Sequence, residues 1–131
     1  MKLQVSSAVV ASLHAEYASH APHECCGLLF GLAGQVTASQ PAANVHPAPR
    51  THFEIDPRTL ITAHRAARTG GPQIAGYYHS HPGGPARPSS TDRAQAPGDG
   101  KIWAIIGQSE LCFWRDTAEG FIALCYGVED S

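Results

Sequence analysis

Hydrophobic residues along this chain recur with two periods, one typical of strands and one typical of helices. A short apolar run at Leu3–Val5 predicts a first strand. After Ser6 and Ser7, either of which can cap a helix, apolar residues recur at helical spacing. This stripe consists of Val9, Val10, Leu13 and Tyr17. We therefore expect a helix that packs one face on the core and ends before Pro22.

The next part of the chain alternates between apolar runs and turn residues. The run from Glu24 to Gly31 predicts a buried strand, and a hairpin at Gly34 leads to a strand over Gln35–Gln40. A proline-rich loop follows at Pro41–Arg50. Alternation of apolar and polar residues then predicts a strand over Thr51–Ile55.

A second helix is predicted to begin at Asp56, which can cap it, with Pro57 at the first helical position. Its expected inner stripe is Leu60, Ile61, His64 and Ala67. The helix ends at Gly70-Gly71-Pro72.

The last part of the chain combines a strand, a loop, a short helix and three closing strands. Gln73–Tyr78 predicts the strand, Pro82–Pro88 the loop, and Ser89 or Ser90 the start of a helix that ends before Pro97. The closing strands are expected at Lys101–Ile106, Glu110–Arg115 and Gly120–Tyr126. The sequence thus predicts one α/β domain over residues 1–131, with a mixed sheet flanked by helices.

Composition narrows the class of protein. The chain has 131 residues, of which 43% are hydrophobic, which excludes a disordered chain. The net charge is −2 and Lys plus Arg number only 9, so we expect no nucleic-acid partner. No apolar run is long enough to span a bilayer, and the N-terminus lacks the apolar stretch of a secretory signal. We therefore expect no membrane association and a cytoplasmic location.

The four cysteines form no CxxC pair, which argues against a zinc ribbon. We expect reduced thiols that pack as small hydrophobic side chains, with Cys112 and Cys125 in the core because they lie inside apolar runs. For the adjacent pair Cys25 and Cys26, two roles stay open: packing beneath a metal site, or a redox or inhibitory role.

The chemistry concentrates in residues 79–92. His79 and His81 are two residues apart at the end of a predicted strand, so their side chains point to the same side. Asp92, in the first turn of the short helix, is the natural third metal ligand. A set of two histidines and one carboxylate leaves one position open for water, which is typical of catalytic zinc and also suits ferrous iron.

A plainer explanation exists for part of this pattern. Ser89-Ser90-Thr91-Asp92 also fits a capping box, in which a serine precedes an acid by three residues. The Pro/Gly loop before it favours the metal site, because the loop can fold back and bring the start of the helix beside the histidines.

Glu24 is the remaining candidate for catalysis. It lies at the start of an apolar run, where an acid is unusual. A metal hydrolase needs a base that is not itself a ligand. We assign the other histidines to the surface or to packing; they are His14, His20, His23, His46, His52 and His64.

Together these residues resemble a known motif. Glu24, then His79-x-His81, then seven residues, then Ser89-x-x-Asp92 resembles the JAMM motif of the MPN-plus zinc metalloproteases, in the style of their compact prokaryotic members. The similarity extends to Pro82, Cys26-Gly27 with Leu28-Leu29, Asn44, and Phe53 to Pro57. It covers the chain from about Val9 to about Trp114.

The resemblance implies a zinc-dependent peptidase or isopeptidase with an αβ sandwich fold of the cytidine-deaminase-like kind. It implies one zinc ion per chain, bound by His79, His81 and Asp92 with water in the fourth position. Glu24 would act as the general base and then protonate the leaving amine. Ser89 would donate a hydrogen bond to the tetrahedral oxyanion.

The resemblance also indicates a substrate class. Members that cleave polyubiquitin carry long insertions, whereas only Arg93 to Gly100 separate Asp92 from the next predicted strand, so we do not expect selective deubiquitination. Short prokaryotic relatives act on ubiquitin-like proteins and on sulfur-carrier proteins that end in Gly-Gly. The tails of such proteins are therefore the expected substrates, cut at a peptide or isopeptide bond.

Two alternatives belong to other classes of protein. A catalytically silent MPN-type module that only binds a ubiquitin-like partner would contain no metal. Another metal enzyme, either a zinc deaminase or a ferrous oxygenase, would show different signs. The deaminase would need a PCxxC pair, which this chain lacks, and the oxygenase would bind iron and consume oxygen.

Overall fold

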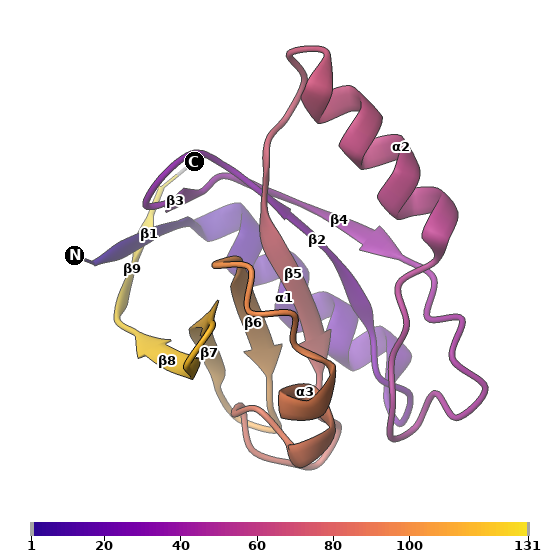
Figure 1. Cartoon of the computed structure of the whole chain (residues 1–131). Coiled ribbons are helices and arrows are strands. Elements are labelled where there is room, and N and C mark those ends of the chain that lie inside the picture. Colours follow the sequence, from indigo (N-terminus) through magenta and orange to yellow (C-terminus); the bar gives the residue numbers. More distant parts are fainter. Residues whose placement is uncertain (1, 131) are drawn as a thin grey trace.

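The computed structural model describes residues 2–130, in which three helices separate single strands or runs of strands (Figure 1). The strands are β1 (Leu3–Ser6), β2 (Cys26–Phe30), β3 (Gln35–Val36), β4 (Ala38–Ala42), β5 (Ile74–Ser80), β6 (Ile102–Ile106), β7 (Leu111–Thr117), β8 (Gly120–Leu124) and β9 (Tyr126–Glu129). The helices are α1 (Ser7–His20), α2 (Pro57–Arg68) and α3 (Ser90–Gln95).

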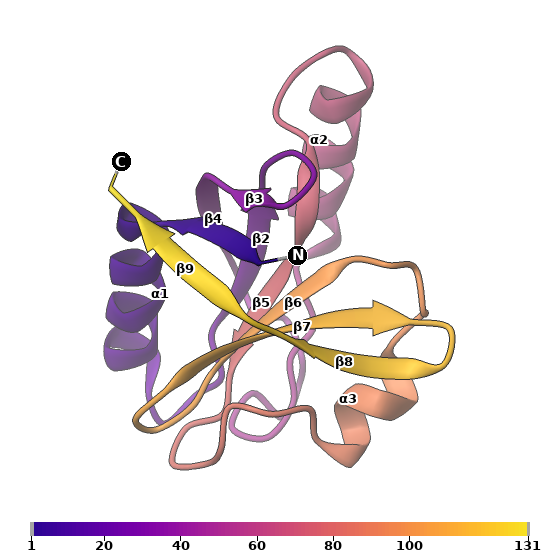
Figure 2. The ribbon, with the colours of Figure 1, turned by 90° about the vertical axis from the view of Figure 1, so that its left-hand side faces the viewer.

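Six of the strands form one mixed sheet in the order β4-β2-β5-β6-β7-β8. β5 and β6 run parallel, and every other neighbouring pair in this sheet is antiparallel. In the smaller second sheet, β1 lies between β3 and β9 and runs parallel to both (Figure 2). Because parallel neighbours need a crossover, the chain must return from the end of β5 to the start of β6, and this return carries α3.

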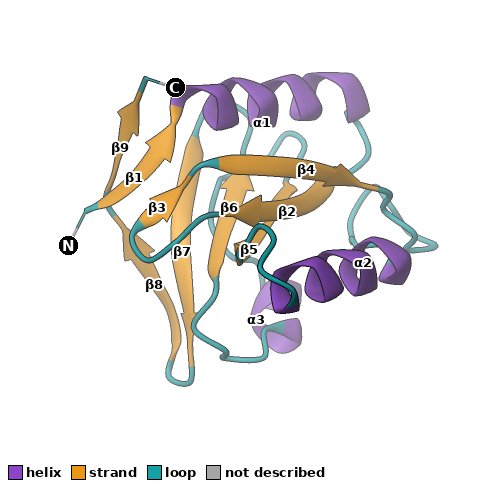
Figure 3. Ribbon diagram, turned by 90° about the horizontal axis from the view of Figure 1, so that it is seen from above, coloured by secondary structure: helices purple, strands orange, loops and turns teal. Residues whose placement is uncertain are grey.

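The large sheet separates two layers of helix. α1 covers one face, and α2 and α3 lie on the other (Figure 3). Each face of the sheet has its own hydrophobic cluster, and successive side chains of β2 point alternately into the two. Leu29 packs in the cluster beneath α1, and Leu28 packs in the cluster that includes Ala63 of α2. In β5, Tyr78 belongs to the cluster beneath α1, so the next residue, His79, faces the side of α2 and α3.

The predicted helix starts are confirmed. The Ser6 hydroxyl accepts the Ala8 backbone N–H at 3.2 Å at the start of α1, and a carboxylate oxygen of Asp56 accepts the Arg58 N–H at 3.0 Å at the start of α2. α2 ends before Gly70, which takes a φ of +89° that suits glycine. The mixed α/β class predicted from the sequence is also confirmed.

The predicted strand over Thr51–Ile55 is wrong. Within the described part of the chain, this segment contributes only an isolated bridge between Asn44 and Ile55. β4 is already the edge strand of the large sheet and ends at Ala42, so no neighbouring strand extends far enough to pair with the segment. Instead, the chain forms a loop over residues 43–56, which we call the 43–56 loop. Two backbone hydrogen bonds close it, from the Val45 N–H to the Glu54 carbonyl and from the Asp56 N–H to the Ala43 carbonyl.

Some burial predictions also fail. In α2 only Ala63 is buried and Ile61 is 53% exposed, because the helix packs on the sheet with a narrow face. Leu60 and His64 line an open cleft beside the helix. Cys112 is partly exposed and Cys125 is exposed, since one side of β7 faces solvent and Cys125 lies in the connection between β8 and β9. Cys25 and Cys26 are buried. No helix within residues 2–130 combines the length and the apolar character needed to cross a membrane.

Candidate metal centre and active site

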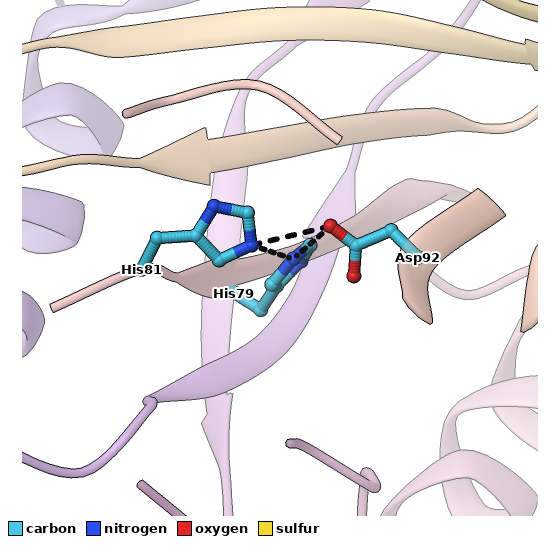
Figure 4. A group of neighbouring side chains, drawn as sticks. All are labelled: His79, His81 and Asp92. Carbon is cyan, nitrogen blue, oxygen red and sulfur yellow. Dashed lines mark hydrogen bonds and ion pairs between the residues drawn. The ribbon is translucent and has the colours of Figure 1, made fainter. Parts of the chain in front are cut away.

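Two imidazoles meet a carboxylate at the end of β5. His79 is the next-to-last residue of β5, His81 follows the strand, and Asp92 lies in the first turn of α3. Nε2 of His79 lies 3.1 Å from Nε2 of His81, and the two nitrogens lie 3.1 and 3.2 Å from Oδ2 of Asp92 (Figure 4). The structure thus brings together the three residues that the sequence suggested as metal ligands.

The arrangement fits a small tetrahedral cation. With bonds of about 2.0–2.1 Å, neighbouring ligand atoms around tetrahedral zinc lie about 3.3 Å apart, close to the separations seen here. His79 and Asp92 are buried, and no Lys or Arg makes an ion pair with Asp92 among the described residues. A carboxylate and two imidazole nitrogens that converge without a basic partner form a donor set suited to a divalent metal.

Asp92 is held as an anion. Burial alone would raise the pKa of this carboxyl, but hydrogen bonds from His79 and His81 outweigh burial and hold the pKa well below its usual range. Its Oδ2 also accepts the Ser89 N–H at 2.9 Å, while the Ser89 hydroxyl accepts the Asp92 N–H at 3.0 Å. The capping box is therefore present, and the same carboxylate oxygen faces the two imidazoles. The structure thus contains the capping box and also has the arrangement that the metal-site explanation expects.

Each imidazole is oriented by its surroundings. Nδ1 of His81 lies 3.0 Å from the Pro85 carbonyl and can only donate to it, which fixes the ring so that Nε2 faces Asp92. Burial would lower the pKa of His81, but hydrogen bonds to Asp92 and to the Pro85 carbonyl raise it. The His79 ring stacks on Phe53, with centroids 4.2 Å apart and planes 16° apart, and meets the edge of Trp103. Burial lowers the pKa of His79, which favours the neutral ring that a metal requires.

Glu24 lies just before β2 and lines the same cleft as Asp92. Its side chain is buried, and Oε1 has no hydrogen-bond partner in the described protein. Burial raises the pKa of Glu24 to about 7, against an opposing effect of His81. A buried carboxyl with one oxygen that lacks a hydrogen-bond partner and with a pKa near neutrality can both accept and release a proton.

A cleft of about 620 Å³ leads away from this group of residues. The 43–56 loop and α2 form one side of the cleft, and α3 and the segment after it form the other, with Tyr77 and Trp103 contributed by the sheet. Ser89 also lines the cleft. Because the Ser89 oxygen accepts the Asp92 N–H through a lone pair, its hydroxyl hydrogen is available to a bound molecule.

Several residues of this region were not predicted from the sequence to lie at the site. His46 and His52, which we assigned to the surface or to packing, stack on one another and line the cleft together with His64. Phe53 was expected in a strand and instead lies in the 43–56 loop, where its ring stacks on that of His79. Asn44 and Phe53 belong to the segment that resembles the family, which was the one signal that marked them.

Comparisons with known proteins agree with this geometry. Residues 6–117 match the family model described as prokaryotic homologues of the JAB domain. A desampylase of Haloferax volcanii is 39% identical over 113 residues, which cover 82% of this chain and 80% of that protein. A protein of Thermus thermophilus named "probable TtuB-protein conjugate cleaving protease" is 37% identical over 94 residues, which cover 72% of this chain and 63% of that protein.

Solved structures share the fold. A solution structure of a protein from Desulfitobacterium hafniense superposes with a TM-score of 0.85 at 27% identity, covering 98% of this chain and 94% of that one. A JAB1/MPN domain protein from Archaeoglobus fulgidus matches with a TM-score of 0.60 at 18% identity, covering 96% and 98%, and so supports the fold alone. The family expected from the motif is confirmed: this chain belongs to the prokaryotic JAB-domain family.

Proposed function

We propose that this protein is a zinc-dependent isopeptidase or peptidase that releases ubiquitin-like or sulfur-carrier proteins from their conjugates. One observation carries the proposal: three possible ligand atoms 3.1–3.2 Å apart lie beside a cleft that is also lined by Glu24, whose buried Oε1 has no hydrogen-bond partner in the described protein. The relatives support the substrate class, since one is named a desampylase and another a conjugate-cleaving protease.

His79, His81 and Asp92 would hold one zinc ion. When bound, zinc lowers the pKa of water and polarises a carbonyl oxygen. The protein contributes the orientation of the ligands: Phe53 fixes the plane of the His79 ring, and the Pro85 carbonyl directs the Nε2 lone pair of His81 toward the site. The preference for zinc over other divalent metals is part of this proposal.

Glu24 moves the proton. Its free Oε1 accepts a proton from the attacking water and then returns it to the nitrogen of the leaving amine. A pKa of about 7 suits both steps near neutral pH, because neither protonation state is strongly favoured. General acid–base catalysis of this kind contributes roughly 10²–10⁴-fold to the rate.

Ser89 stabilises the oxyanion. Its hydroxyl hydrogen is free, and its position is fixed because it caps α3. A donor that is held in place before the reaction stabilises the developing charge without reorganisation, and losing one such donor typically costs roughly 10²–10³-fold in rate.

The cleft suits a slender extended tail. Its apolar lining includes Leu60, Tyr77 and Trp103, and it is bounded on both sides by protein segments. We propose that the C-terminal tail of the carrier protein lies here, with small glycines next to the metal centre and a larger side chain farther along the cleft. Pockets that bind extended peptides combine such apolar surface with a few polar groups.

The direct test is cleavage of defined conjugates. Zinc-loaded protein is incubated with a carrier protein joined either to an amino acid or to a lysine side chain, and the products are read by mass. We expect release of the free carrier, and loss of release with Glu24→Gln while zinc is retained. Undiminished turnover by Glu24→Gln would refute the mechanism. Purified protein that binds a carrier but contains no metal by elemental analysis and cleaves nothing would identify a docking module instead.

A further inference from the structure

The side chain of Asn44 uses its full hydrogen-bonding capacity. Its Nδ2 donates to the carbonyl oxygens of Glu24 at 3.1 Å and His52 at 3.0 Å. Its Oδ1 accepts the backbone N–H groups of His46 at 3.1 Å and Glu54 at 3.0 Å. An amide side chain has two donor hydrogens and two acceptor lone pairs, so all four are occupied. Asn44 therefore joins three points of the 43–56 loop to the backbone of Glu24.

Glu24 depends on its backbone for its position. The free Oε1 means that the carboxyl group is not fully fixed through hydrogen bonds of its own. The backbone is held by the 43–56 loop on both sides, because the Glu24 N–H donates to the Pro49 carbonyl at 2.7 Å and the Glu24 carbonyl accepts from Asn44. The base is thus placed by the loop, and the loop is held in shape by Asn44.

The same amide also fixes the neighbour of a metal ligand. Its contacts at His52 and Glu54 are on the residues before and after Phe53, whose ring stacks on His79. One side chain therefore sets the distance between the base and the ring that supports the metal centre. Catalysis is sensitive to such distances, since a displacement of about 1 Å can lower the rate roughly 10²-fold.

We infer that Asn44 is a positioning residue for the catalytic base, acting through the backbone of Glu24 and the 43–56 loop. The inference rests on the proposed function, in which Glu24 transfers the proton. It assigns Asn44 a role in the chemical step. The proposed metal ligands lie in β5, directly after β5 and in α3, and none of the four hydrogen bonds of Asn44 reaches them.

The test uses two substitutions of different severity. Asn44→Asp keeps the acceptors for His46 and Glu54 but replaces the donor to the Glu24 and His52 carbonyls with an oxygen. Asn44→Ala removes all four hydrogen bonds. We expect both to lower kcat by about 10- to 100-fold with little change in KM. Zinc affinity, titrated on metal-free protein, is expected to change less than about threefold. Changes of about 10- to 100-fold are typical of residues that hydrogen-bond directly to the side chains of metal ligands, which Asn44 does not do.

Two controls separate this role from a general loss of structure. Gln73→Ala removes another side-chain amide with two hydrogen bonds, at the end of α2 and outside the cleft, and is expected to leave kcat unchanged. In protein that already carries Glu24→Gln, adding Asn44→Ala is expected to cause no further loss of the residual rate, because the base it positions is absent. Amide hydrogen exchange of metal-free Asn44→Ala should show faster exchange at Glu24, His46 and Glu54.

Three results would overturn the inference. They are an Asn44→Ala kcat equal to that of Gln73→Ala, a further loss in the Glu24→Gln background, and a loss of zinc affinity that parallels the loss of rate. Full activity of Glu24→Gln would instead refute the proposed function itself, so the two failures are distinguishable.

Discussion

Removing the charge of Glu24 should stabilise the metal-free protein at alkaline pH. The pKa of this buried carboxyl is raised from its ordinary value of 4.5 to about 7, chiefly by burial. Between these two values the folded protein holds a proton that the unfolded chain releases. The free energy of unfolding of the parent protein therefore falls as the pH rises through this window, and Glu24→Gln abolishes that fall.

The size of the effect follows from the same shift in pKa. The full difference corresponds to about 3 kcal/mol at about 1.4 kcal/mol per pH unit. Water in the open cleft screens part of the charge, so we expect about 1–2 kcal/mol at pH 8 and almost none at pH 5. For a domain of this size that is a rise in Tm of about 3–8 °C.

Urea titrations of chelator-treated protein at pH 5 and pH 8 measure the effect. The parent protein and Glu24→Gln are compared with Glu119→Gln, which alters an exposed acid in the turn between β7 and β8. His79 and His81 are present in all three proteins, so the difference between proteins reports the contribution of Glu24 together with its electrostatic interaction with His81. The conclusion that burial disfavours the charged form of Glu24 would be refuted by either of two results. One is that Glu24→Gln changes the free energy of unfolding equally at pH 5 and pH 8. The other is that Glu119→Gln stabilises the protein as much as Glu24→Gln does.

Three further predictions concern the metal centre. Ser89→Ala should lower kcat by roughly 10²–10³-fold while zinc is retained. Loss of the helix cap should also lower the free energy of unfolding by about 1 kcal/mol. An unchanged kcat in steady-state kinetics would contradict this prediction. His79→Ala should abolish zinc binding, seen as loss of metal in elemental analysis and of any zinc-dependent rise in Tm; retained stoichiometric zinc would exclude His79 as a ligand. Trp114→Phe removes the indole N–H that donates to the Ala86 carbonyl at 3.1 Å, next to the Pro85 carbonyl that orients His81. It should weaken zinc affinity by up to about 10-fold, measured by competition with a chelator, and unchanged affinity would show that the loop holds its shape without this bond.

The features that could be predicted from the sequence are those set by residues close together in the chain. Ser6 and Asp56 begin helices because a short polar side chain before an apolar stripe satisfies backbone N–H groups of the first turn, a property of neighbouring residues only. The convergence of His79, His81 and Asp92 could be predicted because the strand end, the tight loop and the helix start each constrain direction.

What failed depends on distant parts of the chain. Residues 51–55 have the alternation of a strand, but no unpaired neighbouring strand reaches them, so they form a loop. Ile61 has the spacing of a core residue but is 53% exposed, because the face that α2 turns to the sheet is narrow and buries only Ala63. Three of the four hydrogen bonds of Asn44 join residues 8 to 20 positions apart, which no local pattern indicates.

Oδ2 of Asp92 has two partners of different kinds, a backbone N–H at the beginning of α3 and the pair of imidazoles. Binding of the proposed zinc ion and folding of this short helix would consequently be linked equilibria, in which binding of the ion stabilises the helix. Removing the ion should therefore destabilise the first turn of α3, which positions Ser89. The protein would then lose the metal and the well-placed Ser89 hydroxyl together.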